Sequence, residues 1–323
     1  MIKSPRFLLI PILYIVTISV FGGNLLAMGT FDLLRQDVTP RGSALGGHPV
    51  ALSYSGLDAQ TANPAGLTNL QERQAMIDYA DHPLDLFAGY LAYGKPIYKG
   101  YLTIAITHFN YGTFDRFITE YAENEGTFQA GDYLFAASYG YRPPFEGMYV
   151  GATVKYIHSK IESYSSQAIA VDLGWLWRTG FQGIDLGITL SNLGTQFSPF
   201  SDRRENLPAI LRIGATKQLE HLPLQLTATA HLEGEENAAS LFSGKYDEIF
   251  ATLGGEFIVS ELMKLRAGYS TLGDNYRVGN FNDRLAGLSW GIGITYHQYK
   301  FDYAFHSLGS AGYVHRVGIT FKF

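Results

Sequence analysis

The stretch Leu-Ser-Trp-Gly-Ile-Gly-Ile-Thr-Tyr at residues 288–296 decides the fold, because every second side chain in it is large and apolar. Successive side chains of a β-strand point to opposite faces of the sheet. Leu288, Trp290 and Ile292 therefore share one face, and the residues between them are Ser or Gly. A soluble β-sandwich would carry charged residues on its second face, whereas this face is small and weakly polar. The pattern indicates a transmembrane barrel strand, with lipid against its apolar face and a polar lumen behind it.

The same alternation recurs from about residue 73 to the last residue. Residues 184–190 alternate Ile and Leu with Asp, Gly and Thr, and residues 224–230 alternate Leu and Ala with Gln and Thr. The pattern predicts an all-β fold, a transmembrane antiparallel β-barrel of about fourteen strands, and bacterial single-chain barrels have an even number. The predicted strands cover residues 73–80, 84–95, 99–110, 131–142, 147–159, 165–178, 182–192, 207–218, 222–232, 247–259, 262–272, 286–297, 299–307 and 311–323.

Aromatic residues near the ends of these strands are interpreted as girdles at the level of the lipid headgroups, where amphipathic rings are favoured. The alternative is the general preference of aromatic residues for strands. The residues are Tyr79, Tyr90, Tyr101, Tyr133, Tyr141, Trp175, Trp177, Tyr269 and Tyr296.

The connections between the predicted strands are sorted by length. Those near residues 96–98, 143–146, 179–181, 219–221, 260–261 and 298 are short, and those at 111–130, 193–206, 233–246 and 273–285 are long and polar. Outer-membrane barrels have short periplasmic turns and longer extracellular loops. The sequence therefore predicts an integral protein of the cell outer membrane, in contact with outer-membrane lipid, with its N- and C-termini periplasmic.

The last predicted strand ends in an aromatic residue that is also the end of the sequence. Its apolar face carries Tyr313, Val317, Ile319, Phe321 and Phe323. This arrangement resembles the C-terminal strand that the barrel-assembly machinery recognises in bacterial outer-membrane proteins. We therefore expect that machinery to be a partner during insertion.

The first segment predicts export. Lys3 and Arg6 precede the apolar residues 7–22, and small residues follow at 23–27. This order is typical of a secretory signal peptide, and an uncleaved membrane anchor is the alternative. The predicted organisation is a signal peptide at 1–27, a plug segment at 28–72 and an outer-membrane β-barrel at 73–323.

Composition and motifs argue against several other classes of function. The formal net charge of −5 does not favour binding to nucleic acid, and the lack of Cys excludes disulfides and thiolate chemistry. Residues 287–291 fit the G-x-S-x-G pattern of hydrolases, but that motif requires a strand-to-helix turn and here lies within a predicted strand. Inward-facing Ser289 with His231, His297 or His306 leaves a lipase-type barrel as a distant alternative. The scattered His residues predict no metal site, and we expect no cofactor and no enzymatic activity.

The segment at residues 28–72 does not alternate. Small residues at 42–47 would let its backbone pack closely against other backbone, and Asn63 followed by Pro64 is typical of the start of a helix. We predict a plug inside the barrel, and a periplasmic arm below it is the alternative. The plug motif comprises Ala44, Leu45, Gly46, Gly47, Asn63, Pro64, Ala65, Gly66 and Leu67.

This pair of motifs ahead of a barrel resembles the plug region of the FadL-like outer-membrane superfamily, and more closely the PorV/PorQ family of type IX secretion barrels. Further resemblance lies at residues 110–112, 126–133, 161–172 and 192–194. The resemblance implies a plugged barrel of fourteen strands without enzymatic activity, acting as a structural or anchoring component of type IX secretion. It implies surface-attachment proteins, PorZ-like or sortase-like, as partners. The alternative is a FadL-like channel for uptake of hydrophobic compounds, although the small and polar inward faces predict a narrow or filled lumen.

Overall fold

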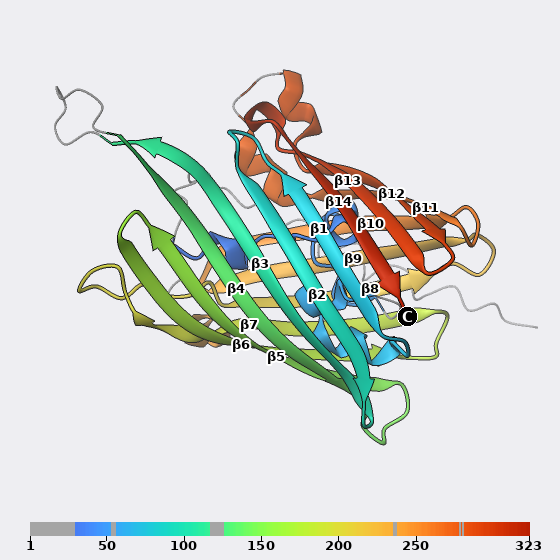
Figure 1. Cartoon of the computed structure of the whole chain (residues 1–323). Coiled ribbons are helices and arrows are strands. Elements are labelled where there is room, and N and C mark those ends of the chain that lie inside the picture. The colour runs from blue at the N-terminus through green and yellow to red at the C-terminus, as the bar shows by residue number, and fades with distance from the viewer. Residues whose placement is uncertain (1–29, 53–55, 117–125, 235–237, 278, 280) are drawn as a thin grey trace, which may run out of the picture.

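A computed structural model of the chain describes residues 30–52, 56–116, 126–234, 238–277, 279 and 281–323. The predicted signal peptide lies outside the described residues. In the described part of the chain, fourteen strands form one closed antiparallel barrel, shown in Figure 1. The strands are β1 (Gln74–Asp81), β2 (Phe87–Ile97), β3 (Gly100–Asp115), β4 (Thr127–Tyr141), β5 (Met148–Ile161), β6 (Tyr164–Arg178), β7 (Ile184–Ser198), β8 (Ile210–Gln218), β9 (Leu224–Gly234), β10 (Tyr246–Ile258), β11 (Met263–Ser270), β12 (Leu288–Tyr296), β13 (Tyr299–Ser307) and β14 (Tyr313–Lys322).

Each strand pairs with its neighbours in sequence, and β1 pairs with β14 to close the cylinder. The register of that closing pair runs from Gln74 opposite Lys322 to Asp81 opposite His315. The predicted transmembrane barrel of about fourteen strands is confirmed. Among the described residues, no helix is both long enough and apolar enough to cross a membrane.

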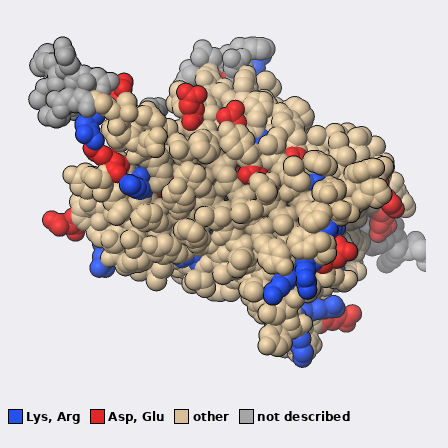
Figure 2. Space-filling model, in the orientation of Figure 1, with Lys and Arg blue, Asp and Glu red and all other residues tan. Residues whose placement is uncertain are grey.

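The alternation along each strand sorts side chains between the lumen and the outside. On β12, Trp290 is 50% exposed, whereas its neighbour Ser289 is 4% exposed. The outer face carries large apolar residues around the barrel, and Figure 2 shows a broad band with few charges between two ends where charged side chains gather. Such a band suits contact with hydrocarbon.

The aromatic girdle prediction is wrong for Tyr90 and Tyr101. Both lie on the inner face of the barrel and are 3% and 1% exposed. The Tyr90 hydroxyl donates a hydrogen bond to Gln60 Oε1 (3.3 Å), and the Tyr101 hydroxyl donates one to the Glu72 carbonyl (2.8 Å). Position near a strand end does not determine the face, which is set by the parity of the residue along the strand.

The two ends of the barrel differ, as the connection lengths predict. At the end that carries the C-terminus, here called the turn end, β2–β3, β4–β5 and the later pairs are joined by short turns. At the opposite loop end lie the longer connections, which include α3 (Ala238–Ser243), η3 (Thr271–Tyr276), η4 (Phe281–Leu285) and η5 (Gly309–Ala311). The expected loops at 111–130 and 193–206 are partly wrong, because β3, β4 and β7 continue into them. The register shifts near Asn110 and Asn192 let the pairing resume beyond each bulge.

Residues 30–52 and 56–73 precede the barrel and run inside it, and we call them the plug. Its short helices are η1 (Asp32–Leu34), α1 (Pro40–Ala44), α2 (Ala59–Ala62) and η2 (Pro64–Asn69), drawn in blue in Figure 1. The plug begins near the loop end, because Phe31 packs against Ile157 and Leu207. It ends at the turn end, where β1 begins beside the C-terminal residue Phe323. The periplasmic location of both termini stays a prediction.

Candidate functional site

The plug crosses the lumen and contacts opposite sides of the wall. The helix α1 lies against β11–β14, and η2 lies against β3–β6. The two halves of the predicted plug motif fall at these two contacts: Ala44 ends α1 and Leu45 caps it, while Asn63 caps η2. Ala44, Leu45, Gly46, Asn63, Pro64, Ala65, Gly66 and Leu67 are all buried, and Gly47 is partly exposed. The structure therefore brings both halves of the motif to the inner wall.

On the α1 side, the turn after the helix depends on glycine. Gly46 and Gly47 have φ angles of +93° and +107°, in the left-handed region that favours glycine. The Gly47 N–H donates to the Gly42 carbonyl (3.0 Å). The facing wall is also glycine, because a Cβ at Gly254 or Gly268 would lie 2.5 Å from backbone atoms of Leu45. The plug backbone thus packs directly on strand backbone.

On the η2 side, the side chain of Asn63 forms hydrogen bonds both within the plug and to the barrel wall. Its side-chain oxygen accepts from the Ala65 N–H (3.0 Å) and caps the helix. Its amide nitrogen donates to the carbonyls of Val50 (2.7 Å) and Trp175 on β6 (3.0 Å). A Cβ at Gly151 on β5 would lie 2.5 Å from the Ala65 nitrogen. Asn63 therefore links η2 to the plug backbone at Val50 and to β6 of the barrel wall.

A buried network of charges surrounds α1. Arg41 Nε donates to Glu256 Oε2 (3.0 Å), and Arg266 Nε donates to the same oxygen (2.7 Å). Arg266 also contacts Asp302 (2.6 Å), and Arg41 lies 3.6 Å from Asp58. Burial alone would lower the pKa of Arg41, but the carboxylates of Glu256 and Asp58 outweigh it and raise that pKa. The carboxylate of Glu256 on β10 thus joins the plug to β11, and the Arg266–Asp302 ion pair extends the network to β13.

The middle of the plug contains a buried acid and a buried histidine. Asp37 accepts hydrogen bonds from the Thr39 N–H (3.0 Å), the Thr39 hydroxyl (2.7 Å) and the His48 N–H (2.8 Å). Burial opposes its ionisation, but these donors and the nearby His48 ring hold the pKa of Asp37 below its usual value. Burial, together with the positive charge of Arg212, lowers the pKa of His48 to about 4. His48 is therefore neutral at pH 7.

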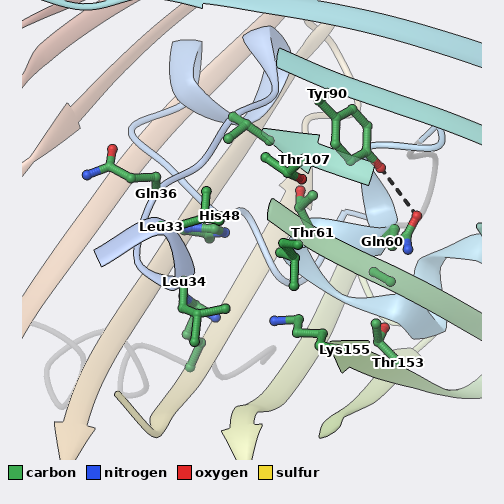
Figure 3. A pocket seen from close by; sticks show the side chains of 14 residues that line it. Leu33, Leu34, Gln36, His48, Gln60, Thr61, Tyr90, Thr107, Thr153 and Lys155 are labelled. Carbon is green, nitrogen blue, oxygen red and sulfur yellow. Dashed lines mark hydrogen bonds between the residues drawn. The ribbon is translucent and has the colours of Figure 1, made fainter. Parts of the chain in front are cut away.

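A cavity of about 40 Å³, here called the inner cavity, lies between the plug and the wall. Figure 3 shows Leu33 and Leu34 on one side of it, Gln60 and Thr61 on another, and Tyr90 and Lys155 projecting from the wall. A cavity that binds benzene has a volume of roughly 150 Å³, and one water needs about 10–15 Å³. At this volume the inner cavity has room for a few waters and is too small for an aromatic ring.

A larger pocket opens at the loop end, and we call it the mouth pocket. Its volume is about 320 Å³, within the usual range for sites that bind small molecules. Most of its lining is apolar, and the rings of Phe114 and Phe128 stack at a centroid distance of 5.5 Å. The lining residues are Thr30, Tyr111, Phe114, Phe128, Ala130, Asp132, Ser159, Ile161 and Phe200. Four of its nine lining residues are aromatic.

The residues weighed for hydrolase chemistry do not form a catalytic site. Ser289 lies within β12, with no helix after it, opposite His306 on β13. The Ser289 hydroxyl has no hydrogen-bond partner, so His306 does not activate it. His231 accepts from Arg212 Nε (3.2 Å) elsewhere in the lumen, and His297 is exposed in a turn. Among the described residues, no group of three His, Asp or Glu side chains could hold a metal ion.

The predicted insertion strand is β14, which closes the barrel against β1. Tyr313, Val317 and Ile319 project outward and are 41–49% exposed, and Phe323 is 54% exposed at the turn end. The Phe323 N–H donates to the Arg73 carbonyl (3.0 Å), so the last residue is still part of the closing pair. The rings of Phe321 and Phe323 are in contact in a tilted arrangement, with a centroid distance of 5.0 Å. Recognition of this strand by the assembly machinery stays a prediction.

Sequence reasoning missed the charge network and the mouth pocket. Arg41 comes directly before the predicted motif, and Glu256, Arg266 and Asp302 occupy inward positions of alternating strands. Charged residues at inward positions next to small residues were the available signal. The mouth pocket had no signal of its own, because its aromatic residues come from separate segments that were expected to be loops.

No family model matches the chain, and no curated protein matches it. Among solved structures, the Pseudomonas putida toluene transporter TodX is similar to this chain at 12% identity, covering 86% of this chain and 94% of its own, with a TM-score of 0.58. A TodX mutant described as a monoaromatic hydrocarbon channel is similar at 12% identity, covering 90% and 98%, with a TM-score of 0.60. A Pseudomonas aeruginosa FadL homologue is similar at 13% identity, covering 87% and 96%, with a TM-score of 0.51. The fold is that of FadL-like outer-membrane barrels, and the narrower resemblance to PorV/PorQ proteins gains no support.

Proposed function

We propose that this FadL-like barrel is an outer-membrane channel that admits a small hydrophobic compound from the loop end. The mouth pocket carries the proposal, because it combines a volume of about 320 Å³ with a mostly aromatic and aliphatic lining. Its position among the loop-end segments fits capture from outside the cell. The similarity of the fold to a toluene transporter and to a FadL homologue supports the same class of ligand.

The start of the plug separates the mouth pocket from the inner cavity. Thr30 lines the mouth pocket, and Leu33 and Leu34 line the inner cavity. Phe31 and Leu34 pack against wall residues of β5 and β6 and against Leu207. A compound that passes inward must therefore displace residues 30–34, while the more deeply docked α1 and η2 stay in place. In this mechanism the first turn of the plug is the gate.

The gate is held by a small number of polar contacts in addition to its apolar packing. Asn192 Nδ2 donates to the Leu34 carbonyl (3.3 Å), and Arg35 forms ion pairs with Asp32 and Glu233. Arg35 is partly exposed, so its ion pairs are screened more than those of Arg41. This difference supports a gate that opens at lower free-energy cost than the rest of the plug.

Uptake of labelled toluene tests the proposal. The full chain would be expressed in the outer membrane of a Gram-negative host that lacks its own channel of this type. We expect saturable uptake above that of the empty host. The double variant Phe114→Ala/Phe128→Ala should reduce uptake at low concentration by about tenfold or more, because each lost ring removes roughly 1.5–3 kcal/mol of apolar contact.

The matched control is Phe145→Ala/Phe181→Ala, which removes two exposed rings at the turn end. This variant should take up toluene like the wild type. Slower gel migration after boiling would verify that each variant forms a barrel. Uptake equal to that of the empty host, or equal loss in both double variants, would contradict the proposed channel.

The role in type IX surface attachment stays a prediction. It follows from the resemblance of the plug motifs, and no contact in the described structure identifies a protein partner. Co-purification in mild detergent addresses it. Recovery of PorZ-like or sortase-like proteins would support attachment, whereas recovery of the barrel with a bound hydrophobic compound supports the channel.

A further inference from the structure

The mouth pocket has one polar position within its apolar lining. Asp132 on β4 and Ser159 on β5 lie side by side in the register of these strands and are both buried. The Tyr111 hydroxyl donates a hydrogen bond to Asp132 Oδ2 (2.7 Å). Phe114, Phe128 and the other apolar lining residues provide the rest of the surface. A ligand in this pocket would therefore contact aromatic side chains over most of its surface and polar side chains at one position.

The polar position is rich in acceptors. An ionised carboxylate offers about four acceptor sites and no donor, and a tyrosine hydroxyl offers one donor and remains an acceptor. The single donor of Tyr111 is already directed at Asp132, and Ser159 adds one hydroxyl that can donate or accept. A hydroxyl or ring-bound amino group on the ligand could therefore donate a hydrogen bond to a free acceptor site of Asp132. A ligand without a donor would displace water from the carboxylate and would form no hydrogen bond in its place, which costs binding free energy.

The charge of the pocket disfavours anions. The nine lining residues include Asp132 and no Lys, Arg or His. The nearby Arg116 is paired with Glu162, so its charge is already compensated. A ligand carboxylate would approach Asp132 without a cation between them, and like charges in a partly dry site repel strongly. The pocket is therefore poorly suited to a fatty acid or an aromatic acid in its ionised form.

We propose that the mouth pocket selects neutral amphiphiles, namely compounds with an aromatic or compact aliphatic body that carries one hydroxyl, or an aromatic body that carries one ring-bound amino group. Tyr111 and Asp132 are the specificity-determining residues, and the Phe114–Phe128 pair binds the apolar body. This inference rests on the proposed channel function and names the class of compound within it. Acidic compounds are excluded by the carboxylate of Asp132, and pure hydrocarbons bind through the rings alone.

Three probes that share one ring test the proposal: toluene, p-cresol and p-toluate. Binding of each labelled compound to the detergent-purified full chain would be measured by equilibrium dialysis. The wild type should bind p-cresol and toluene and bind p-toluate at least about tenfold more weakly than either. The measured quantities are the affinity ratios between probes, because these cancel differences in the amount of folded protein.

Two variants separate the hydrogen bond from the charge. Tyr111→Phe/Asp132→Leu replaces both partners by apolar groups of similar shape, which is tolerated better than removing one. It should lower the ratio of p-cresol to toluene affinity by about fivefold to tenfold. Asp132→Asn keeps an acceptor but removes the charge, so it should raise p-toluate affinity and change that ratio less. Asp247→Asn, at an exposed position at the same end of the barrel, is the control and should change neither.

The outcomes distinguish the inference from the function on which it rests. If the wild type binds none of the three probes and takes up no toluene, the proposed channel is wrong. If toluene binds and is taken up but both variants leave the affinity ratios unchanged, the channel stands and the proposed selectivity is overturned. Tighter binding of p-toluate than of p-cresol by the wild type would also overturn it.

Discussion

The two sides of the plug are held to the barrel by different physical means. Around α1, Arg41 and Arg266 share the carboxylate of Glu256, and the contact depends on buried charges that compensate one another. Around η2, the backbone of Pro64 and Ala65 fits against Gly151, and the contact depends on shape and on the hydrogen bonds of Asn63. A charged contact fails when a partner is lost or neutralised, whereas a close-packed contact fails when atoms are added. The two sides can therefore be broken separately.

The absence of cysteine from the chain allows each side to be observed. A single substitution, Val38→Cys near α1 or Leu67→Cys in η2, introduces one thiol at a buried position. The rate of maleimide labelling relative to the unfolded chain then measures how often that side of the plug opens. The predictions below use these two reporters, in order of expected effect.

The largest effect is expected for Glu256→Gln. It removes the charge shared by Arg41 and Arg266 and leaves both cations less compensated in a buried site, which costs about 3–5 kcal/mol in comparable networks. Labelling at position 38 should rise by two orders of magnitude or more, while labelling at position 67 should change little. Equal increases at both positions would show that the plug opens as a single unit.

Acid should loosen the middle of the plug. The pKa of His48 is about 4 in the docked plug and near 6.5 when the plug is exposed. The exposed form therefore gains a proton first as the pH falls, so docking is fully stable above pH 6.5 and weakens between pH 6.5 and 4. The loss is on the order of 3 kcal/mol at most.

The measurement is labelling at position 38 at each pH, divided by the rate for the unfolded chain at the same pH. His48→Asn should flatten the dependence on pH between 6.5 and 4. A wild-type profile that does not change in this window would contradict the assignment of a neutral His48.

A smaller effect, on the opposite side of the plug, is expected for Gly151→Ala. The added Cβ would lie too close to the backbone of Pro64 and Ala65. Overpacking of this kind costs about 1–3 kcal/mol. Labelling at position 67 should rise about tenfold or more and labelling at position 38 should stay near the wild-type rate. Gly255→Ala is the matched control, because its Cβ would find only ordinary contacts at 3.5 Å.

The smallest effect is expected for Lys322→Ala. Lys322 lies 4.0 Å from Glu72 where the plug leaves the lumen, and both side chains are about half exposed. Exposed ion pairs contribute about 0–1 kcal/mol. Both labelling rates should stay within about fivefold of the wild type at low salt. A larger change would mean that the contact between Lys322 and Glu72, rather than the two docked sides of the plug, determines how often the plug opens.

The sequence predicts the barrel well because the face on which each side chain lies can be read from the few residues around it. Alternation at residues 288–296 assigns each side chain to the wall or the lumen, and parity alone decides the face. The same rule corrects the expectation for Tyr90 and Tyr101, whose parity places them inside despite their position near strand ends. Extension of β7 past Asn192 was missed, because a bulge shifts the parity and interrupts the pattern on which strand prediction depends.

The candidate site was predicted only in part because it depends on distant partners. Residues 44–47 and 63–67 carry a recognisable pattern, but their function follows from which glycines face them across the lumen. Arg41 and Glu256 are 215 positions apart, and nothing local to either residue indicates the other. The mouth pocket similarly unites residues of β3, β4 and β5 with Phe200, and its selectivity depends on a three-dimensional arrangement.

The pairing of β1 with β14 has a consequence for how the protein is made. The seam joins the first strand to the last, so the cylinder cannot close until translation of the whole chain is complete. The plug precedes the first strand and packs on strands from both halves of the sheet. The plug therefore completes its contacts with both halves of the wall only when the seam has formed.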